Sequence, residues 1–354
     1  MQGFSVIICC HNGAARLPTT LAHLMVQEHP MMPWEVVLIN NCSTDGTSEV
    51  ARSCWQNGPT PLRVIDESHP GVRYARERGL AEAKYEFLGF VDDDNWVAND
   101  WVRTAYDIIS SDPSLGAVGS IRTPACEVSP PSWFETFHPI YAVLTDHDFE
   151  QIRQPIQDLP TSGLCVRKAA WEKLIRDGFR FQLTGRLGKK LLGGEDAELT
   201  MALRLSGWRL RVDQRLRLQH FMPSHRLRWM YLRRLQRGYA ASHVLLDAYS
   251  AHSLSLRPGF RRWLSERWWY QFGNSLRRMA SQPNAVIGAL FSRGEGRHEI
   301  IEIEQQFGRA LGLLQHSYKY SELRREIRDA VWRGWLDCSE VHFDDGANNT
   351  ILTN

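Results

Sequence analysis

The sequence of 354 residues lacks long apolar runs and paired-cysteine motifs. No stretch approaches the roughly 18 consecutive apolar residues of a membrane-spanning helix, so no such helix is expected. The opening residues Met1-Gln2-Gly3-Phe4 carry no basic side chain, which argues against a secretory signal. The seven cysteines are scattered, without a CxxC pair or a Cys/His spacing typical of zinc. We therefore expect reduced, buried thiols in a cytoplasmic protein.

The sequence also lacks a strong excess of one charge. Its formal net charge is +2 and 23% of its residues are charged, so no nucleic-acid partner is inferred for the chain as a whole. The basic residues are unevenly placed, because ten arginines and a single acid, Asp213, stand between Arg204 and Arg237. That segment could meet phosphate, anionic lipid or nucleic acid. The apolar content of 43% is enough for a sizeable core, and the length suits one large domain with an appendage, or two domains.

Strand and helix patterns alternate through the first third of the sequence. Short runs rich in β-branched and aromatic residues predict strands, and apolar residues three or four apart predict helices. The expected strands are 4–10, 34–39, 62–66 and 87–91, and the expected helices are 14–27, 44–55, 72–84 and one from about 100. Four βα units in succession predict an α/β fold with a mainly parallel sheet covered on both faces. Ligands of such sheets bind beyond the carboxyl ends of the strands.

The remaining sequence is less regular. Residues 120–160 are rich in proline and aromatic residues and predict a long irregular excursion, of the kind that often forms lids or acceptor sites. A short strand at 163–167 and helices at 168–176 and 195–206 are expected next. A helical pattern begins near Leu227, and the last residues, 344–354, are polar and expected to fray.

Three consecutive acids, Asp92-Asp93-Asp94, follow the buried strand that ends at Val91. Unpaired carboxylates are costly near a core, so packing alone gives no reason for them. A divalent cation that also grips phosphate would explain them, because Mg²⁺ and Mn²⁺ are held by one or two carboxylates together with substrate phosphates. The alternative is an Asx-rich turn that opens the next helix.

Further polar residues follow the other strands in a recognisable order. Asn12 follows the first strand and the run NNCSTDGT, residues 40–47, follows the second. Arg76 lies early in the third helix, the aspartate triplet follows the fourth strand, and Glu195-Asp196 opens a later helix. Together these motifs resemble the inverting nucleotide-sugar glycosyltransferases of family 2. The resemblance covers about residues 4–240 and implies a GT-A fold, a Rossmann-like mixed sheet with helices on both faces, followed here by a C-terminal α-helical region.

The resemblance implies a donor and metal site. Asp92 and Asp94 match the outer acids of a D-x-D motif: Asp92 would contact the ribose or the metal, and Asp94 would bind the Mn²⁺ or Mg²⁺ that bridges the diphosphate. Asp93 lies between them on the donor side. His220 ends another strand-like run and is a further candidate metal ligand, with a structural histidine as the alternative.

The resemblance also implies a catalytic base. Asp196 matches the aspartate expected to deprotonate the acceptor, and Arg76 matches an arginine that reaches the nucleotide. Glu195 would orient Asp196, or be a solvated acid of the first helical turn. Capping of the helix is the alternative role for Asp196.

Two departures from the family pattern concern the donor. Cys10-His11 stands before Asn12 where the family usually has Thr-Tyr, and Asn40 stands where the family commonly has an aspartate. An amide at position 40 can both donate and accept hydrogen bonds, whereas a carboxylate only accepts. Cys10, Asn12 and Asn40 are therefore candidate donor-binding residues, and UDP is the donor nucleotide that the resemblance implies.

The motifs and the family resemblance together imply a metal-dependent inverting glycosyltransferase that uses a nucleoside-diphosphate sugar. The resemblance alone implies that it builds a surface polysaccharide or glycolipid on a glycan or lipid-linked acceptor. Its catalytic domain would span 1–226, with the donor side at about 1–120 and the acceptor side at about 121–226. The helical appendage, 227–354, carries tryptophans among arginines and is not expected to carry the chemistry. It could pack on the catalytic domain, form a homo-oligomer or place the protein at the inner membrane face.

Two other functions are compatible with such a sheet. A sugar nucleotidyltransferase would usually show a glycine-rich loop after the first strand, but residues 4–16 contain one glycine, Gly13. A non-catalytic sugar-binding or scaffold protein is disfavoured by the joint presence of Asp92, Asp94 and Asp196. Hydrolysis of the donor in the presence of Mn²⁺ would discriminate between these functions.

Overall fold

The computed structural model describes residues 1–28, 31–152, 156–185, 191, 193–250, 259–291 and 294–334. Within these ranges one mixed eight-stranded sheet has the strand order β3-β2-β1-β4-β7-β6-β8-β5. The strands are β1 (Phe4–Cys10), β2 (Trp34–Asn41), β3 (Leu62–Glu67), β4 (Phe87–Phe90), β5 (Asn95–Val97), β6 (Leu115–Cys126), β7 (Cys165–Arg167) and β8 (Arg209–Met222).

The N-terminal half of the sheet is parallel and covered on both faces, as the alternating pattern predicts. β1 pairs in parallel with β2 and β4, and β2 pairs in parallel with β3. Successive side chains of β1 point to opposite faces: Ile7 joins the core cluster that contains α3, while Val6 and Ile8 join the cluster that contains α1 and α4. The connecting helices are α1 (Leu17–Met25), α2 (Thr47–Cys54), α3 (Val72–Glu82) and α4 (Trp101–Ser111).

The second half of the sheet corrects one expectation. Residues 120–160 do not form one long irregular excursion, because residues up to Cys126 belong to the twelve-residue strand β6, which pairs in parallel with β8. The prolines misled the prediction. The N–H of Arg122 points away from β8, toward Leu144, and the nitrogen of Pro124 two residues on faces the same side. Proline therefore removes no hydrogen bond of the β6–β8 ladder.

Short helices and the helix that carries the Glu-Asp pair complete this half. β7 joins β4 to β6 by antiparallel pairing, and β5 adds an antiparallel edge to β8. The helical elements are α5 (Phe134–Phe137), η1 (His138–Tyr141), α6 (Asp146–Glu150), α7 (Lys168–Arg176) and α8 (Glu195–Leu205). The six cysteines in the described ranges are free, and Cys338 lies outside them.

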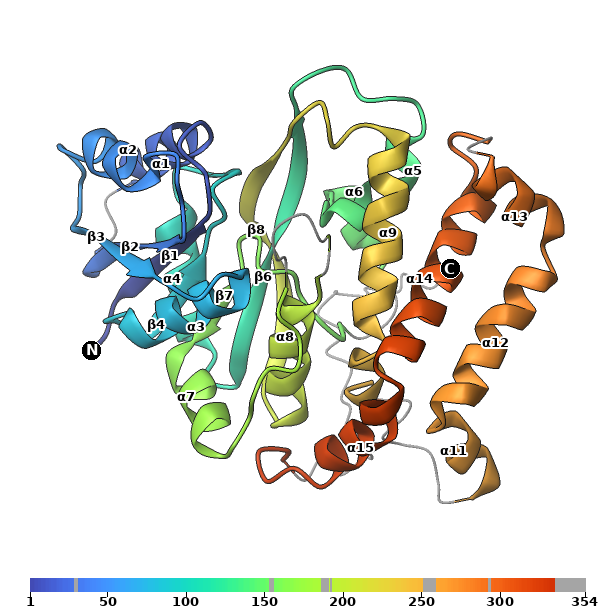
Figure 1. Cartoon of the computed structure of the whole chain (residues 1–354). Helices are drawn as coiled ribbons and strands as arrows, with labels where there is room; N and C mark the ends of the chain where they lie inside the picture. The colour runs from blue at the N-terminus through green and yellow to red at the C-terminus, as the bar shows by residue number, and fades with distance from the viewer. Residues whose placement is uncertain are drawn as a thin grey trace, which may run out of the picture.

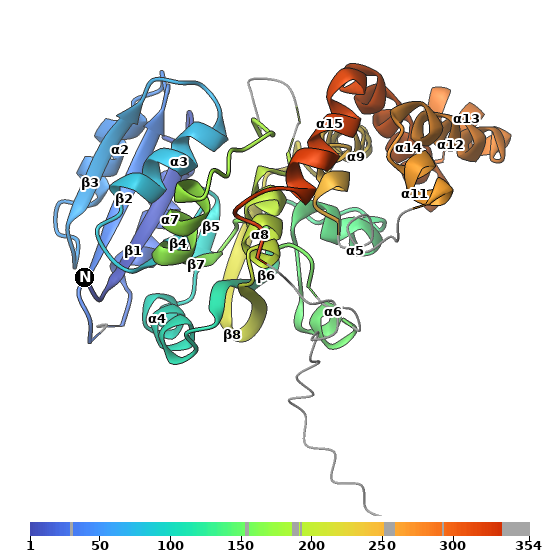
Figure 2. The ribbon, with the colours of Figure 1, turned by 90° about the horizontal axis from the view of Figure 1, so that it is seen from below.

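A helical region follows β8, near the predicted position. It contains α9 (Trp229–His243), η2 (Leu246–Ala248), α11 (Phe260–Ser265), α12 (Trp268–Ala280), α13 (Pro283–Leu290), α14 (His298–Gln315) and α15 (Ser317–Arg328). Figure 1 shows α9 between the sheet and α14, with α12 and α13 farther out. Figure 2 shows the same helices gathered on one side of the molecule, opposite β1, β2 and β3. The predicted frayed end, 344–354, lies outside the described residues.

Glycines and a buried ion pair bring α14 close to α9. A Cβ added at Gly308 would lie 2.2 Å from the Arg237 carbonyl oxygen, and one at Gly312 would lie 2.1 Å from the Ala241 carbonyl oxygen. Only glycine permits this approach. The buried Glu304 of α14 accepts hydrogen bonds from Arg237 and from a second arginine of α9. Across the described residues, no helix combines the length and the apolarity that crossing a membrane requires.

Candidate active site

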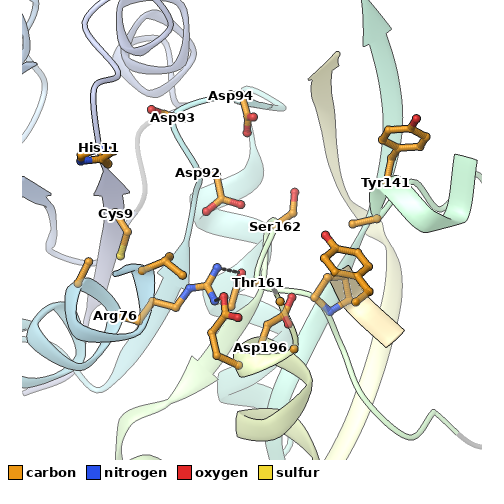
Figure 3. A pocket seen from close by; sticks show the side chains of 18 of the residues that line it. Cys9, His11, Arg76, Asp92, Asp93, Asp94, Tyr141, Thr161, Ser162 and Asp196 are labelled. Atoms are coloured by element: carbon orange, nitrogen blue, oxygen red, sulfur yellow. Dashed lines mark hydrogen bonds and ion pairs between the residues drawn. The ribbon is translucent and has the colours of Figure 1, made fainter. Parts of the chain in front are cut away.

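A cavity of about 450 Å³ lies where the parallel strands end, as expected for this sheet. One side is formed by residues at or just after the ends of β1, β2 and β4, including Cys10, Asn41 and Asp92. The other side is formed by the segment before β7, the start of α8 and one face of α9. Figure 3 shows the aspartate triplet on one side of this space, Arg76 and Asp196 beneath it, and Tyr141 opposite.

All three residues of the aspartate triplet line the cavity, but they have different partners. Asp93 is held by Arg16, whose Nη2 lies 2.6 Å from Oδ2, and by the Cys10 thiol, which donates to Oδ2 at 3.2 Å. Burial raises the pKa of that thiol, so Cys10 remains a donor at neutral pH. Burial also raises the pKa of Asp92, and the charge of Asp94 adds to the effect while Arg76 opposes it. A cation beside Asp92 and Asp94 would relieve the repulsion between these two carboxylates.

Asp94 lies within reach of His220, which belongs to β8, and of Arg226, which follows β8. Arg226 Nη1 donates to Asp94 Oδ2 at 3.0 Å, and His220 Nε2 lies 3.6 Å from Asp94 Oδ1. His220 is only 9% exposed and its Nδ1 is buried without a hydrogen-bond partner. An orphaned buried ring nitrogen is costly unless a ligand satisfies it.

The side chains present fit a divalent cation whose coordination shell is completed by oxygen atoms of the substrate. Within the described ranges, no three His, Cys, Asp or Glu side chains are already arranged around a cation position. Mg²⁺ and Mn²⁺ need only one or two carboxylates when a diphosphate supplies further oxygens. Asp94 and Asp92 would be those carboxylates, with His220 beside them.

Arg76 lines the cavity, where its charge interacts with both Asp92 and Asp196, and its contact with the nucleotide stays a prediction. Its Nη1 donates to Glu195 Oε1 at 2.5 Å and its Nη2 donates to Thr161 Oγ1 at 2.5 Å. Desolvation alone would lower the pKa of Arg76, but Glu195, Asp92 and Asp196 raise it, so the guanidinium stays charged. Arg76 therefore joins the aspartate triplet to the Glu-Asp pair, a contact that the sequence did not reveal.

Asp196 lies in the first turn of α8 and faces the cavity. The cap position of this helix is Gly194, which adopts a φ of 105°, so Asp196 is not the cap residue. Its Oδ1 accepts a hydrogen bond from the Ala197 N–H at 2.9 Å, which fixes the carboxylate at the positive end of the helix. The arrangement holds the carboxylate of Asp196 at the cavity, within reach of a bound acceptor, as a base requires.

Two predicted donor-binding residues lie beside the cavity but do not line it. Asn12 adopts a φ of 50° and its Oδ1 accepts a hydrogen bond from the Thr44 N–H at 2.8 Å, which fixes the turn after β1. Asn40 donates to Asp66 Oδ1 at 2.9 Å. The neighbouring Asn41 lines the cavity instead. A role for Asn12 and Asn40 in donor binding stays a prediction.

The sequence missed the contribution of α9. Tyr231, Leu235, Tyr239 and His243 line the cavity, although residues from 227 onward were expected to lie apart from the chemistry. Their spacing of four residues is the periodic signal of one helix face. This periodicity can be read from the sequence, but it does not distinguish a helix face that packs on a core from one that borders a cavity.

With this geometry established, comparison with known proteins identifies the family. Residues 5–174 match the model of the glycosyl transferase family 2. This part of the chain belongs to glycosyltransferase family 2. The match ends within α7, so it contains β1 to β7 and the aspartate triplet, while α8 and α9 lie beyond it.

Two curated relatives are similar to parts of this chain. A poly-beta-1,6-N-acetyl-D-glucosamine synthase of Staphylococcus epidermidis is 27% identical over 119 residues, which are 33% of this chain and 28% of the synthase. A glucosyl-dolichyl phosphate glucuronosyltransferase of Haloferax volcanii is 21% identical over 242 residues, 67% of this chain and 75% of that protein. The chain thus spans about a quarter of the first relative's length.

The solved structure is a mannosyltransferase from Pyrobaculum calidifontis in complex with GDP-Man and Mn²⁺. It superposes with a TM-score of 0.59 at 16% identity and covers 90% of this chain and 88% of its own. At this identity the likeness shows the fold alone. The GT-A fold that the motifs predict is therefore confirmed, with the helical region after it.

Proposed function

We propose that this family 2 protein transfers a sugar from a nucleoside-diphosphate sugar to an acceptor hydroxyl, with inversion at the anomeric carbon. The observation that carries the proposal is the convergence of Asp92, Asp94 and Asp196 on one cavity. These acids come from segments about a hundred residues apart, so local turn formation does not account for their meeting. Their surroundings differ, which suits two separate tasks.

Asp92 and Asp94 would hold the donor through a divalent cation. When bound, Mn²⁺ or Mg²⁺ neutralises charge on the departing diphosphate. Arg226 and His220 already surround the Asp94 carboxylate and fix its orientation. Arg16, which pairs with Asp93, adds positive charge at the same edge. Cationic groups placed where charge develops lower the barrier to displacement.

Asp196 would act as the single base. It accepts the proton of the acceptor hydroxyl while that oxygen forms a bond to the anomeric carbon. The bond from this carbon to the diphosphate breaks, and the nucleoside diphosphate leaves with the electron pair. One displacement from the face opposite the leaving group inverts the configuration. Glu195 is occupied by Arg76 and is the less suitable base.

The relatives support the biological class of product. Their names describe a poly-beta-1,6-N-acetyl-D-glucosamine synthase and a glucuronosyltransferase that acts on a dolichyl phosphate-linked glucose. We extend this to a surface polysaccharide or glycolipid, with a glycan or lipid-linked acceptor. UDP is the proposed donor nucleotide from the motif resemblance, and the GDP-Man complex of the mannosyltransferase makes a GDP sugar the necessary comparison.

A ligand-binding screen followed by a turnover assay tests the proposal. Ligands that bind only the folded protein raise its melting temperature. We expect one class of UDP- or GDP-sugar to raise it in the presence of Mn²⁺, and that sugar to be hydrolysed slowly with release of nucleoside diphosphate. A protein that binds no nucleotide sugar contradicts the proposal, and one that binds a donor without turnover is a non-catalytic binding protein.

A further inference from the structure

The side of the cavity that faces the aspartate triplet is an aromatic wall. It consists of Tyr141, which follows α5, together with Tyr231 and Tyr239 of α9. The rings of Tyr141 and Tyr231 are stacked, with centroids 6.3 Å apart and planes at 12°. The Tyr141 hydroxyl donates to the Arg226 carbonyl oxygen at 3.0 Å, which ties this wall to the segment that holds Asp94.

Two glycines allow α9, which carries part of this wall, to pack closely against the segment that leads to the proposed base. Gly193 and Gly194 immediately precede Glu195-Asp196. A Cβ added at Gly193 would lie 2.6 Å from Tyr239 Cε1, and one at Gly194 would lie 3.0 Å from His243 Cδ2. The rings of Tyr239 and His243 are themselves stacked, with centroids 5.8 Å apart and planes at 6°. The two glycines are therefore needed so that two aromatic rings of α9 can lie on the chain just before Asp196.

The charges of the cavity separate it into two sides. Among the described residues that line it, Arg16 pairs with Asp93, Arg226 pairs with Asp94 and Arg76 pairs with Glu195. The aromatic wall contributes no lysine or arginine to the lining. Each arginine among the described residues that line the cavity is already paired with a carboxylate, so a phosphate group placed against the wall would meet the charge of Asp196 with no unpaired lining arginine to offset it. A neutral ligand would not meet this penalty.

We propose that the aromatic wall is the acceptor subsite and that the acceptor group it binds is a neutral sugar ring of a glycan. A pyranose ring has an apolar face of C–H groups and a polar edge of hydroxyls, so it can cover Tyr231 or Tyr239 while one hydroxyl reaches Asp196. Tyrosine offers a large, rigid surface at low entropic cost, together with a polar group. The inference rests on the proposed glycosyl transfer and adds the class of acceptor and its binding residues.

The test uses the full chain with the donor identified by thermal shift and Mn²⁺. Release of nucleoside diphosphate is measured without acceptor, with neutral oligosaccharides (chitotriose, cellotriose and maltotriose) and with glycerol phosphate as a phosphate-bearing control. We expect at least one neutral oligosaccharide, and not glycerol phosphate, to accelerate release. In Tyr239→Leu the KM for that oligosaccharide should rise about tenfold or more, while Tyr239→Phe, which keeps the ring, should remain close to wild type.

Donor binding separates loss of the acceptor subsite from loss of the fold. The Mn²⁺-dependent thermal shift by donor should be the same in Tyr239→Leu as in wild type, and Tyr231→Leu gives a second variant if the first does not fold. If wild type releases no nucleoside diphosphate from any sugar, the proposed function itself fails. If wild type hydrolyses the donor but no neutral oligosaccharide accelerates release, or if both leucine variants keep the wild-type KM, the acceptor inference fails alone.

Discussion

Arg76 of α3 and Glu195 of α8 form a buried ion pair across the floor of the cavity, with Nη1 and Oε1 2.5 Å apart. Their side chains are 9% and 6% exposed. The pair joins the parallel half of the sheet to the helix that begins with the proposed base. It therefore fixes the position of Asp196, the proposed base, relative to Asp92, a proposed donor-binding residue.

Removing Arg76 should destabilise the protein strongly. Arg76→Met removes the arginine partner of the buried Glu195, and loss of one member of a buried pair typically costs about 3–5 kcal/mol. The matched control is Arg78→Met on the same helix, where the arginine is 44% exposed and pairs with Glu82. An exposed pair contributes about 0–1 kcal/mol. Urea unfolding of both variants measures the difference, and equal losses would contradict a structural role for the Arg76–Glu195 pair.

Asp94→Asn should abolish metal-dependent donor binding. The substitution keeps the shape of the side chain but removes the charge that would hold Mn²⁺ opposite the diphosphate. In calorimetry with the nucleoside diphosphate, the gain in affinity caused by Mn²⁺ should fall at least about tenfold. Asp107→Asn, an exposed position on α4, makes the same chemical change away from the cavity and should behave as wild type. An undiminished Mn²⁺ effect in Asp94→Asn would remove Asp94 from the metal site.

The local elements of the fold were predictable because their signals lie within short windows. The strand 4–10 and the helix 168–176 have the predicted bounds, since apolar runs and helical periodicity are local properties. β6 was missed because Pro124, and the further prolines that follow it, indicate a loop. The compatibility of Pro124 with the strand depends on which edge of β6 faces β8, and that pairing joins residues about ninety positions apart.

The candidate site was predictable to a similar extent and for the same reason. Cys10, Asp92 and Asp94 could be predicted because each stands near the end of a strand that the local sequence indicates. All three line the cavity. The pairing of Arg76 with Glu195 is a long-range contact that no local pattern encodes. The position of Tyr239 at the cavity was missed because it depends on contact with Gly193. This glycine lies 46 positions earlier in the chain and meets Tyr239 only after folding.

Glu198 should make the stability of the protein depend on pH. It is fully buried in α8, where it accepts hydrogen bonds from the Tyr249 hydroxyl at 2.7 Å and from the N–H groups of Gln182 and Leu183. Burial raises the pKa of Glu198 from 4.5 to about 7. Because the folded-state value is the higher one, its stabilising contribution is complete below pH 4.5 and is lost as the pH rises through about 7.

The size of this effect follows from the shift. One pKa unit corresponds to about 1.4 kcal/mol. Ionisation of Glu198 should therefore lower the free energy of unfolding by about 3 kcal/mol between about pH 5 and about pH 8. Glu198→Gln cannot ionise, so urea unfolding of this variant should change less over that range than wild type does. The comparison uses the slope of the free energy of unfolding against pH and not its absolute value, because the amide of the variant also alters the hydrogen bonds. Parallel pH profiles would show that Glu198 is already ionised at acidic pH.

Exposed tryptophans and arginines in the helical region are the basis for predicting contact with an anionic membrane. Trp263 and Trp269 are 44% and 47% exposed, while Trp268 packs partly against the core. Residues 259–291 contain five arginines and one acid, Glu266. Such a mixture favours the interface of anionic lipid. We expect the protein to float with phosphatidylglycerol vesicles at low salt, and Trp263→Ser with Trp269→Ser to weaken this. No flotation at low salt, where screening is least, would exclude the membrane. A dimer in sedimentation would then assign this surface to a second subunit.

The most direct test of the central claim is the behaviour of Asp196→Asn. The account assigns donor binding and proton removal to different acids of one cavity, so this variant should bind the donor and Mn²⁺ with wild-type affinity in calorimetry. Its single-turnover release of nucleoside diphosphate should be slower by about 10²–10⁴-fold, the usual contribution of a general base. Asp107→Asn again serves as the matched control. Wild-type turnover in Asp196→Asn, or loss of donor binding in a variant that remains folded, would contradict the account.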